Sequence, residues 1–369
     1  MIMRMSSNIS APGSGATGGP APSAAARHRV AVVGASGYTG AELLRLIAQH
    51  PTFDLVLATG DTQAGTLASA VYPSLTAAYP DLVFEEFDLA KVEGLDAVFL
   101  GLPHEASMAL APLLVGKVGV VVDLSAAYRL KDASLYPGWY GFAHDQPELL
   151  AEAVFGLPEL YRSQLPGARL VATPGCHVTA AALALEPLVA AGMIQRTGIV
   201  VDSITGISGA GRGLKHGSMF CSVDEDLQAY GLLDHRHTPE IEQVIGGNAG
   251  GAQVLFTPHL APLNRAILAT CYAKPATGVS TESLLATLAR RYAGEPFMVV
   301  RPASPSTKAA LGTNTAFLTA RYDDRTDTVI AICAIDNLCK GASGGAIQAA
   351  NVALGIDETA GLQRVGMFP

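Results

Sequence analysis

A strand, a glycine-rich turn and a helix follow one another directly near the start of the chain. Val30–Val33 is a short apolar run typical of a strand buried on both faces, and Gly34–Gly40 reads Gly-Ala-Ser-Gly-Tyr-Thr-Gly. Ala41–Ala48 then has helical spacing and stops before Pro51. In a dinucleotide-binding fold such glycines let the backbone approach a pyrophosphate, which lies on the helix N-terminus. The spacing Gly-x-x-Gly-x-x-Gly is less common than Gly-x-Gly-x-x-Gly, so a tight turn without a ligand remains the alternative.

Three further apolar runs, Leu55–Ala58, Ala97–Leu100 and Val118–Val122, predict more strands of a parallel sheet. The first of them ends in Thr59, where an NAD-specific site usually carries a carboxylate for the ribose. A neutral hydroxyl tolerates a 2′-phosphate, so NADP is favoured over NAD. Asp61 lies just beyond and keeps that preference modest.

Polar residues follow the later strands, at the edge where ligands bind in such sheets. His104 is either a contact to cofactor or substrate or an ordinary surface histidine. Asp123 is followed by Ser125 and Arg129, and the aspartate and the arginine could simply pair with each other.

The second half of the chain has a different character. Strand-like runs occur with few helices between them, which predicts a mixed sheet in a second domain. One helix, Glu282–Tyr292, could cover a face of that sheet, and another, Ala346–Leu354, closes the chain. The predicted strands are Ile199–Asp202, Leu268–Tyr272, Phe297–Val300, Ala316–Ala320 and Thr328–Ala331.

A cysteine stands at the turn that joins the two halves. The apolar segment Ala168–Ala172 precedes Thr173–Cys176, which reads Thr-Pro-Gly-Cys, and Ala180–Leu188 has the composition of a helix. Free backbone N–H groups and the helix dipole at such a turn favour a thiolate, which is what a covalent nucleophile needs. The alternative is a small residue that packs a strand–helix corner.

Composition limits the classes of function. The 369 residues are 49% hydrophobic and 15% charged, which is typical of a globular protein with a sizeable core. A net charge of −8 disfavours nucleic acid and anionic membranes as partners. The five scattered cysteines suggest neither disulfides nor a metal site and fit a cytoplasmic location. Residues 1–27 predict a disordered tail, and no apolar run is long enough to span a membrane.

Three motifs of the second half carry chemistry. Gly206–Gly213 is glycine-rich and contains Arg212, so it is either an anion-binding loop or a flexible surface loop. His235–Glu240 reads His-Arg-His-Thr-Pro-Glu and offers two imidazoles for acid–base work before a helix expected to start at Pro239. Asp336–Gly341 follows an apolar strand and could face a bound nicotinamide.

As an ordered set, these motifs resemble the N-acetyl-γ-glutamyl-phosphate reductases of arginine biosynthesis, a family within the wider semialdehyde-dehydrogenase group. The resemblance covers nearly all of the chain after residue 27. The matching segments are Gly34–Gly40, Asp123–Leu130, Tyr140–Gly141, Gly156–Glu159, Pro174–Cys176, Gly206–Arg212, His235–Ile241 and Asp336–Gly341.

The resemblance implies an α/β fold of two domains. A Rossmann-type NADP-binding domain would span residues 28–173 and be completed by residues 338–369. An α/β catalytic domain with a mixed β-sheet used for oligomerisation, as a homodimer or homotetramer, would span residues 174–337.

The implied reaction is the reduction of an acyl phosphate with NADPH. Cys176 would expel phosphate to form a thioester, which is a better hydride acceptor than an ester. His235 is our first choice for the general acid, with His237 as the alternative. Substrate contacts are expected from Arg129, Arg212, His237 and Glu240. Cofactor contacts are expected from Gly34, Ser36, Gly37, Tyr38, Thr39, Gly40, Thr59, Ser125, Gly209 and Asn337.

One residue departs from the family pattern, and three readings of function compete. The cysteine is usually followed by Tyr or Asn, whereas this chain has His177, which could alter hydrogen bonding at Cys176 or place another imidazole beside it. Aspartyl phosphate and acetyl-aminoadipyl phosphate are alternative substrates. The glutamyl and aminoadipyl substrates differ by one methylene, and a pocket distinguishes such a difference by only about 1–3 kcal/mol. A non-catalytic NADP-binding module is the alternative of a different class.

Overall fold

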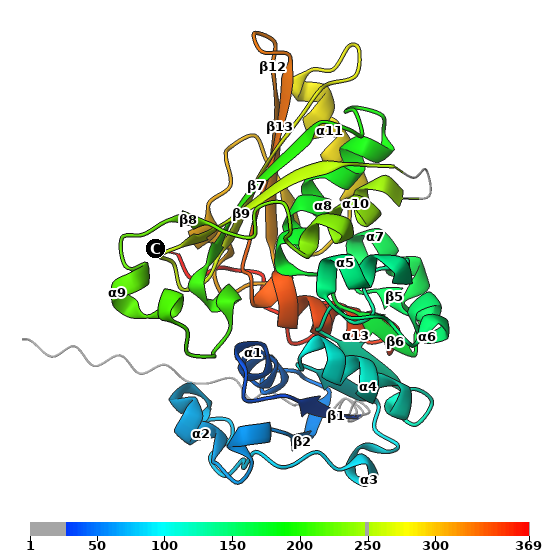
Figure 1. The fold of residues 1–369 in the computed structure, drawn as a ribbon, viewed down its shortest axis with the longest axis vertical. Coiled ribbons are helices and arrows are strands. Elements are labelled where there is room, and N and C mark those ends of the chain that lie inside the picture. The colour runs from blue at the N-terminus through cyan, green and yellow to red at the C-terminus, as the bar shows by residue number, and fades with distance from the viewer. Residues whose placement is uncertain (1–26, 248–250, 369) are drawn as a thin grey trace, which may run out of the picture.

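The computed structural model describes residues 27–247 and 251–368, which form two sheets with helices around them (Figure 1). The predicted tail at residues 1–27 lies outside the described residues except for Arg27. No helix in the described part of the chain is long and apolar enough to cross a membrane.

The first sheet is six-stranded and wholly parallel, in the order β2-β1-β3-β4-β6-β5. Its two faces have separate cores because successive side chains of a strand point to opposite faces. Val30 and Val32 pack with one core, and Ala31 and Val33 with the other. The strands are β1 (His28–Val33), β2 (Phe53–Ala58), β3 (Ala97–Leu100), β4 (Val120–Asp123), β5 (Val154–Phe155) and β6 (Leu170–Ala172).

Helices cover both faces of this sheet, as expected of a doubly wound fold. Helix α1 (Tyr38–Ile47) lies against one face and α4 (His104–Leu114) against the other. The last helix, α13 (Gly344–Ala353), returns to the same face as α1 (Figure 1). The shorter helices of this half are α2 (Ala68–Val71), α3 (Leu89–Val92), α5 (Tyr136–Tyr140), α6 (Pro147–Glu152) and α7 (Pro158–Tyr161).

The second sheet is seven-stranded and mixed, in the order β11-β12-β13-β10-β7-β9-β8. The α/β class with a parallel and a mixed sheet, predicted from the sequence, is therefore confirmed. Strand β9, which contains Pro258 and His259, was not predicted. The strands are β7 (Ile199–Gly206), β8 (Gln228–Ala229), β9 (Val254–Ala261), β10 (Ile267–Ala273), β11 (Met298–Val300), β12 (Ala316–Asp323) and β13 (Thr328–Ile335).

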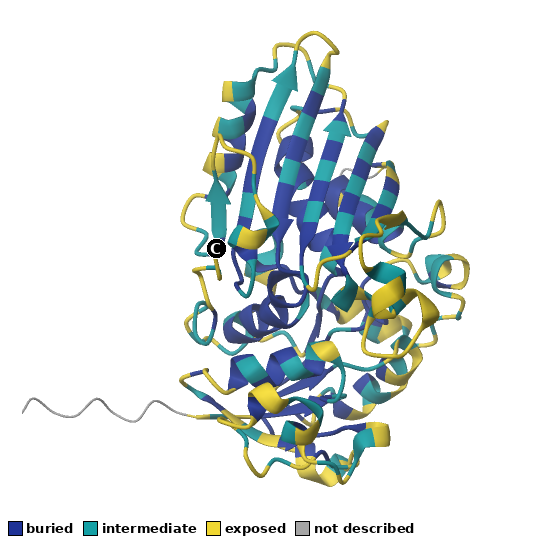
Figure 2. Cartoon of the chain, turned by 90° about the vertical axis from the view of Figure 1, so that its left-hand side faces the viewer, coloured by how far each residue is buried: buried dark blue, intermediate teal, exposed yellow. Residues whose placement is uncertain are grey.

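The two faces of the mixed sheet differ. Helices α8 (Cys176–Ala190), α10 (His237–Gly246) and α11 (Thr281–Arg291) pack on one face in a single core. The other face is turned to the viewer in Figure 2 and shows half-buried stripes between buried ones. Two short helices complete this half, α9 (Phe220–Val223) and α12 (Thr307–Ala310).

Three segments begin earlier than the sequence indicated. Helix α8 begins at Cys176 itself, and α10 begins at His237, two residues before Pro239. The glycine-rich segment before α13 is itself helical, with a π-helical turn over Cys339–Ser343.

The Asp336 carboxylate holds the loop after β13. It accepts hydrogen bonds from three backbone N–H groups, those of Gly312, Leu338 and Cys339.

Candidate active site

Cys176 lies at the first position of α8, after Gly175 in extended conformation. It borders two cavities that meet at its side chain. We call them the histidine cavity, of about 490 Å³, which also contacts His177, His235 and His237, and the junction cavity, of about 340 Å³, which lies between the two sheets. The cysteine is therefore reachable from two sides.

The thiol of Cys176 is protonated at neutral pH in this structure. Burial raises its pKa to about 11, against the opposing effects of the His177 backbone N–H and the Arg129 charge. The backbone N–H groups at the helix N-terminus do lower this pKa, as expected, but desolvation outweighs them. A nucleophile at this position needs a base beside it.

A buried ion pair holds the turn that carries the cysteine. The Nη1 atom of Arg129 lies 3.1 Å from Glu240 Oε1, and both side chains are buried. Arg129 donates to the carbonyl of Thr173 at 2.6 Å, and Gly175 N donates to Glu240 Oε2 at 3.2 Å. Tyr140 donates to the same carboxylate at 2.7 Å. The pair therefore fixes both sides of the Thr-Pro-Gly turn.

These contacts bear on three residues considered from the sequence. Arg129 pairs with Glu240 and not with Asp123, whose carboxylate accepts instead from Ser125 N and Oγ. Arg129 borders the junction cavity, whereas Glu240 and Ser125 are buried and line neither that cavity nor the histidine cavity. We therefore expect Glu240 and Ser125 to position other groups.

The two histidines of the His-Arg-His motif differ in position. His237 borders both cavities, whereas His235 borders only the histidine cavity. The ring of His237 lies so close to Gly175 that a Cβ placed on that glycine would stand 2.2 Å from Nε2. Its Nδ1 is buried without a partner in the described part of the chain, while His235 Nδ1 accepts from His237 N at 3.1 Å.

Both imidazoles are neutral at physiological pH. Burial lowers the pKa of His235 to about 4, helped by the Arg236 charge. Burial also lowers the pKa of His237 well below its usual range, with further contributions from the neighbouring His235 and His177. A neutral imidazole has a lone pair that can accept a proton, and a bound anionic substrate would raise the low pKa of either ring.

The histidine cavity is positively charged. Its lining includes Lys215 and Arg236 and, among the residues the structure describes, no Asp or Glu. Such a lining favours an anionic ligand next to the cysteine.

The glycine turn lies at the opposite side of the junction cavity and has the close packing that a dinucleotide needs. Gly34 has φ +86°, and a Cβ there would stand 2.4 Å from the Gly101 carbonyl oxygen. A Cβ on Gly40 would meet Ala35 Cα at 2.4 Å, so these two glycines bring strand, turn and helix together. Gly37, Tyr38 and Thr39 border the junction cavity.

A third cavity continues from the turn along the ends of β2 and β3. Gly34, Ser36, Gly37 and Thr59 line it, together with Asp61 and Glu86. The hydroxyl of Thr59 accepts from Gly34 N at 3.1 Å, and Ser36 Oγ donates to the Gly60 carbonyl at 3.1 Å. These bonds hold the turn beside a cavity that could accept part of a dinucleotide.

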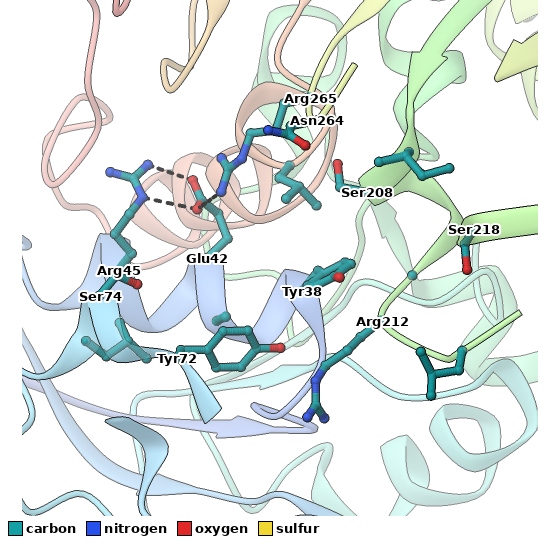
Figure 3. Close-up of a pocket in the computed structure, with 16 residues that line it drawn as sticks. Tyr38, Glu42, Arg45, Tyr72, Ser74, Ser208, Arg212, Ser218, Asn264 and Arg265 are labelled. Carbon is teal, nitrogen blue, oxygen red and sulfur yellow. Dashed lines mark hydrogen bonds and ion pairs between the residues drawn. The ribbon is translucent and has the colours of Figure 1, made fainter. Parts of the chain in front are cut away.

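The glycine–arginine loop, Gly206–Gly213, places Arg212 near Tyr38 and Tyr72 of the half that carries the parallel sheet (Figure 3). Gly209 and Arg212 border the junction cavity, and the Arg212 guanidinium lies 5.8 Å from the centre of the Tyr72 ring. In another part of the cavity drawn in Figure 3, Glu42 accepts hydrogen bonds from Arg45 and Arg265, as the dashed lines mark. Burial raises the pKa of Glu42, but these two arginines outweigh burial and lower it to about 2.

The loop after β13 contributes unequally. Asn337 borders the junction cavity, donates to Ser208 Oγ at 2.9 Å and accepts from Ala266 N at 2.9 Å. Lys340 points away from it and is fully buried, with Nζ 2.6 Å from Glu159 Oε1. His104 also borders the junction cavity, and its Nδ1 accepts from Ala126 N.

Two residues of the histidine cavity were not recognised in the sequence, and a third was only a secondary candidate. Lys215 follows Arg212 by three residues, so the run of glycines and cations was an available signal. Tyr230 lies in a segment without a motif, and nothing in the sequence links it to Cys176. His177 is buried, with Nε2 3.1 Å from the Tyr230 hydroxyl.

Comparison with known proteins identifies the family of the chain. A semialdehyde dehydrogenase NAD-binding domain matches residues 29–168, and a semialdehyde dehydrogenase dimerisation domain matches residues 176–337. The chain is 47% identical to the N-acetyl-gamma-glutamyl-phosphate reductase of Symbiobacterium thermophilum over 342 residues, 92% of this chain and 98% of the relative. It is 44% identical to the protein of the same name from Ectopseudomonas mendocina over 344 residues, 92% of this chain and 99% of the relative.

Solved structures show the same fold at low identity. An aspartate semialdehyde dehydrogenase with NADP from Candida albicans has a TM-score of 0.65 at 17% identity, covering 90% of this chain and all of the other. The resemblance drawn from the motifs is confirmed, and the cofactor class is a nicotinamide dinucleotide. The chain belongs to the N-acetyl-gamma-glutamyl-phosphate reductase family of the semialdehyde dehydrogenases.

Proposed function

We propose that the protein reduces N-acetyl-L-glutamyl 5-phosphate with NADPH to N-acetyl-L-glutamate 5-semialdehyde and phosphate, as a step of arginine biosynthesis. The observation that carries the proposal is the position of Cys176, which separates a cationic cavity from the cavity that leads to the glycine turn. Relatives of the same name at 44–47% identity support the substrate.

The first step forms the thioester. Neutral His237 takes the proton of the Cys176 thiol, and the sulfur attacks the acyl carbon. The carbon–oxygen bond to phosphate breaks, and phosphate leaves with that electron pair. Lys215 and Arg236 compensate the negative charge of the substrate in the cavity.

The second step is reduction. When bound, the dihydronicotinamide supplies a hydride to the thioester carbonyl. Protonated His237 gives its proton to the oxygen of the resulting tetrahedral group. Collapse of this thiohemiacetal releases the aldehyde, and the sulfur recovers the proton. Asn337, Gly209 and the Gly37–Thr39 turn border the cavity where the nicotinamide would be held.

We assign the acid–base role to His237 in preference to His235, our first choice from sequence. His237 borders both cavities, as Cys176 does, and its ring packs against Gly175. His235 borders only the histidine cavity, where we expect it to contact the substrate.

NADP is the preferred dinucleotide in this proposal. The residue at the end of β2 is Thr59, a neutral hydroxyl and not a carboxylate. Initial rates with NADP and NAD should give the higher kcat/KM for NADP. Asp61→Asn should raise this ratio further, because it removes a negative charge from the same cavity.

A second copy of the chain is the proposed partner of the open sheet face. Val200, Tyr272 and Ile330 lie in register across β7, β10 and β13, and each is half-buried. Light scattering should show a dimer or tetramer, and Ile330→Lys should shift it towards monomer. A wild-type monomer would contradict this assignment.

Activity assays test the proposed reaction. Purified protein should oxidise N-acetylglutamate semialdehyde with NADP only when phosphate is present, and aspartate semialdehyde should be a poor substrate. Faster turnover of N-acetylaminoadipate semialdehyde would move the assignment to that substrate. A folded wild-type protein that binds NADP but turns over none of the three would indicate a non-catalytic module.

We also propose a cytoplasmic location, in keeping with the five unpaired cysteines.

A further inference from the structure

A series of buried hydrogen bonds runs from the core of the mixed sheet to the cavity of the nucleophile. Ser203 on β7 lies with Oγ 2.6 Å from His177 Nδ1, and His177 Nε2 lies 3.1 Å from the Tyr230 hydroxyl. Ser203 and His177 are almost completely buried, whereas Tyr230 borders the histidine cavity together with Cys176. His177 thus connects a fixed residue of the sheet to a hydroxyl that borders the same cavity as the thiol.

The direction of these bonds follows from the Ser203 hydroxyl. Among the described residues, its only hydrogen-bond partner is His177 Nδ1. If Ser203 accepted a proton from that nitrogen, its own O–H would be buried without an acceptor, which is unfavourable. Ser203 therefore donates to Nδ1, and the neutral ring carries its proton on Nε2.

The same reasoning extends to Tyr230. Because His177 Nε2–H donates to the phenolic oxygen, the Tyr230 proton is not used in that bond. The described residues provide no other acceptor for it, and Tyr230 borders the cavity. The Tyr230 O–H is therefore free to donate into the histidine cavity.

We propose that Ser203 and His177 are positioning residues that orient the Tyr230 hydroxyl as a hydrogen-bond donor to the negative charge that forms on Cys176. The inference deepens the proposed function, since it concerns the thiolate of that reaction. It also assigns a role to His177, the residue that departs from the family pattern.

The surroundings keep the His177 ring neutral and the Tyr230 hydroxyl protonated. Burial lowers the pKa of His177 to about 3, with smaller effects from His235 and His259, so the ring stays neutral. Burial and the nearby Cys176 raise the pKa of Tyr230, against the effect of Arg236, so its proton is retained. The rings of His235 and His237 also pack against His177, with ring centres 5.9 Å and 5.6 Å away.

The alkylation rate of Cys176 tests the inference without substrate. Cys221 is exposed, so the experiment uses the Cys221→Ser protein, and iodoacetamide labelling of Cys176 is followed by mass spectrometry at neutral pH. Below the thiol pKa, this rate is proportional to the thiolate fraction. Tyr322→Phe is the matched control, because it removes a hydroxyl bonded to the exposed Asp327.

Tyr230→Phe should slow alkylation about tenfold and displace its pH profile by about one unit to higher pH, the effect of one hydrogen bond to a charged atom. His177→Asn, whose amide can reach only Ser203, should do the same without altering Tyr230. His177→Gln, whose amide nitrogen takes the place of Nε2, should stay close to the parent rate.

Unchanged alkylation in Tyr230→Phe or in His177→Asn overturns the inference. An equal loss in His177→Gln and His177→Asn overturns the hydrogen-bonding role and leaves only packing. Because no substrate is used, these results are independent of the reductase assay. A protein inactive on all semialdehydes would refute the proposed function, even if the alkylation pattern held.

Discussion

Removal of one charge from the Arg129–Glu240 pair is the most informative perturbation of the site's framework. Glu240→Gln keeps the shape of the side chain and an oxygen that can accept from Gly175 and Tyr140. It leaves the Arg129 guanidinium, only 8% exposed, without a counter-charge. Loss of one partner from a buried pair costs about 3–5 kcal/mol.

The expected loss is large enough for thermal unfolding to detect. For domains of this size, 1 kcal/mol corresponds to roughly 2–4 °C in Tm, so Tm should fall on the order of 10 °C. Glu152→Gln is the matched control, because it makes the same change in the exposed pair with Arg169. If Glu240→Gln lowered Tm no more than Glu152→Gln, the account of the turn as held by a buried ion pair would be refuted.

Three further predictions concern the cofactor turn, the nucleophile and the core. Gly34→Ala should weaken NADPH binding about tenfold in a fluorescence titration, since the added Cβ would stand 2.4 Å from the Gly101 carbonyl oxygen and displace the turn, at a cost on the order of 1–3 kcal/mol; Gly116→Ala, with the same φ of +86° but open space around it, should not. Alkylation of wild-type Cys176 should rise with pH and level off only near pH 11, because burial raises its pKa; a plateau below the ordinary thiol value of 9.0 would contradict this. Lys340→Met should destabilise the protein by about 3–5 kcal/mol in urea unfolding, because it leaves the Glu159 carboxylate buried and unpaired. Although burial raises the pKa of Glu159, Lys340 holds it below its usual range; without Lys340 the carboxyl can protonate, so the deficit relative to wild type should shrink as pH falls.

Local sequence patterns predicted the elements that position the site. The apolar run before Gly34 and the helical spacing after Gly40 gave β1 and α1 to within a few residues, because both signals are local. The mixed sheet was recognised from β-rich runs in the same way. Strand β9 was missed because Pro258 and His259 interrupt its apolar pattern.

Contacts between distant residues were not predictable in this way. Asp123 and Arg129 are close in sequence, which made a pair between them plausible, but the partner of Arg129 is 111 residues away on α10. Likewise, His177 was visible only as a departure from a family pattern. Its partners Ser203 and Tyr230 come from 26 and 53 residues further along, and only the fold brings them together.

The burial of the cysteine was also beyond the sequence. A helix N-terminus predicted a stabilised thiolate, whereas the structure adds desolvation and reverses the direction of the pKa shift. The strand–turn–helix pattern made Cys176 a candidate nucleophile, and the family resemblance supported it. Its burial, which only the fold reveals, is the reason why we propose a neutral imidazole as its base. The preference for His237 over His235 likewise depends on which ring borders both cavities.

A single-turnover experiment tests the central claim, that Cys176 carries the acyl group between two cavities. The protein is mixed with N-acetylglutamate semialdehyde and NADP without phosphate, and NADPH absorbance and the mass of the Cys176 peptide are recorded together. The account predicts a burst of NADPH equal to the number of active sites, with the N-acetylglutamyl group attached to Cys176. Steady turnover without phosphate, a burst that survives in Cys176→Ala, or an acyl group on another residue would contradict it.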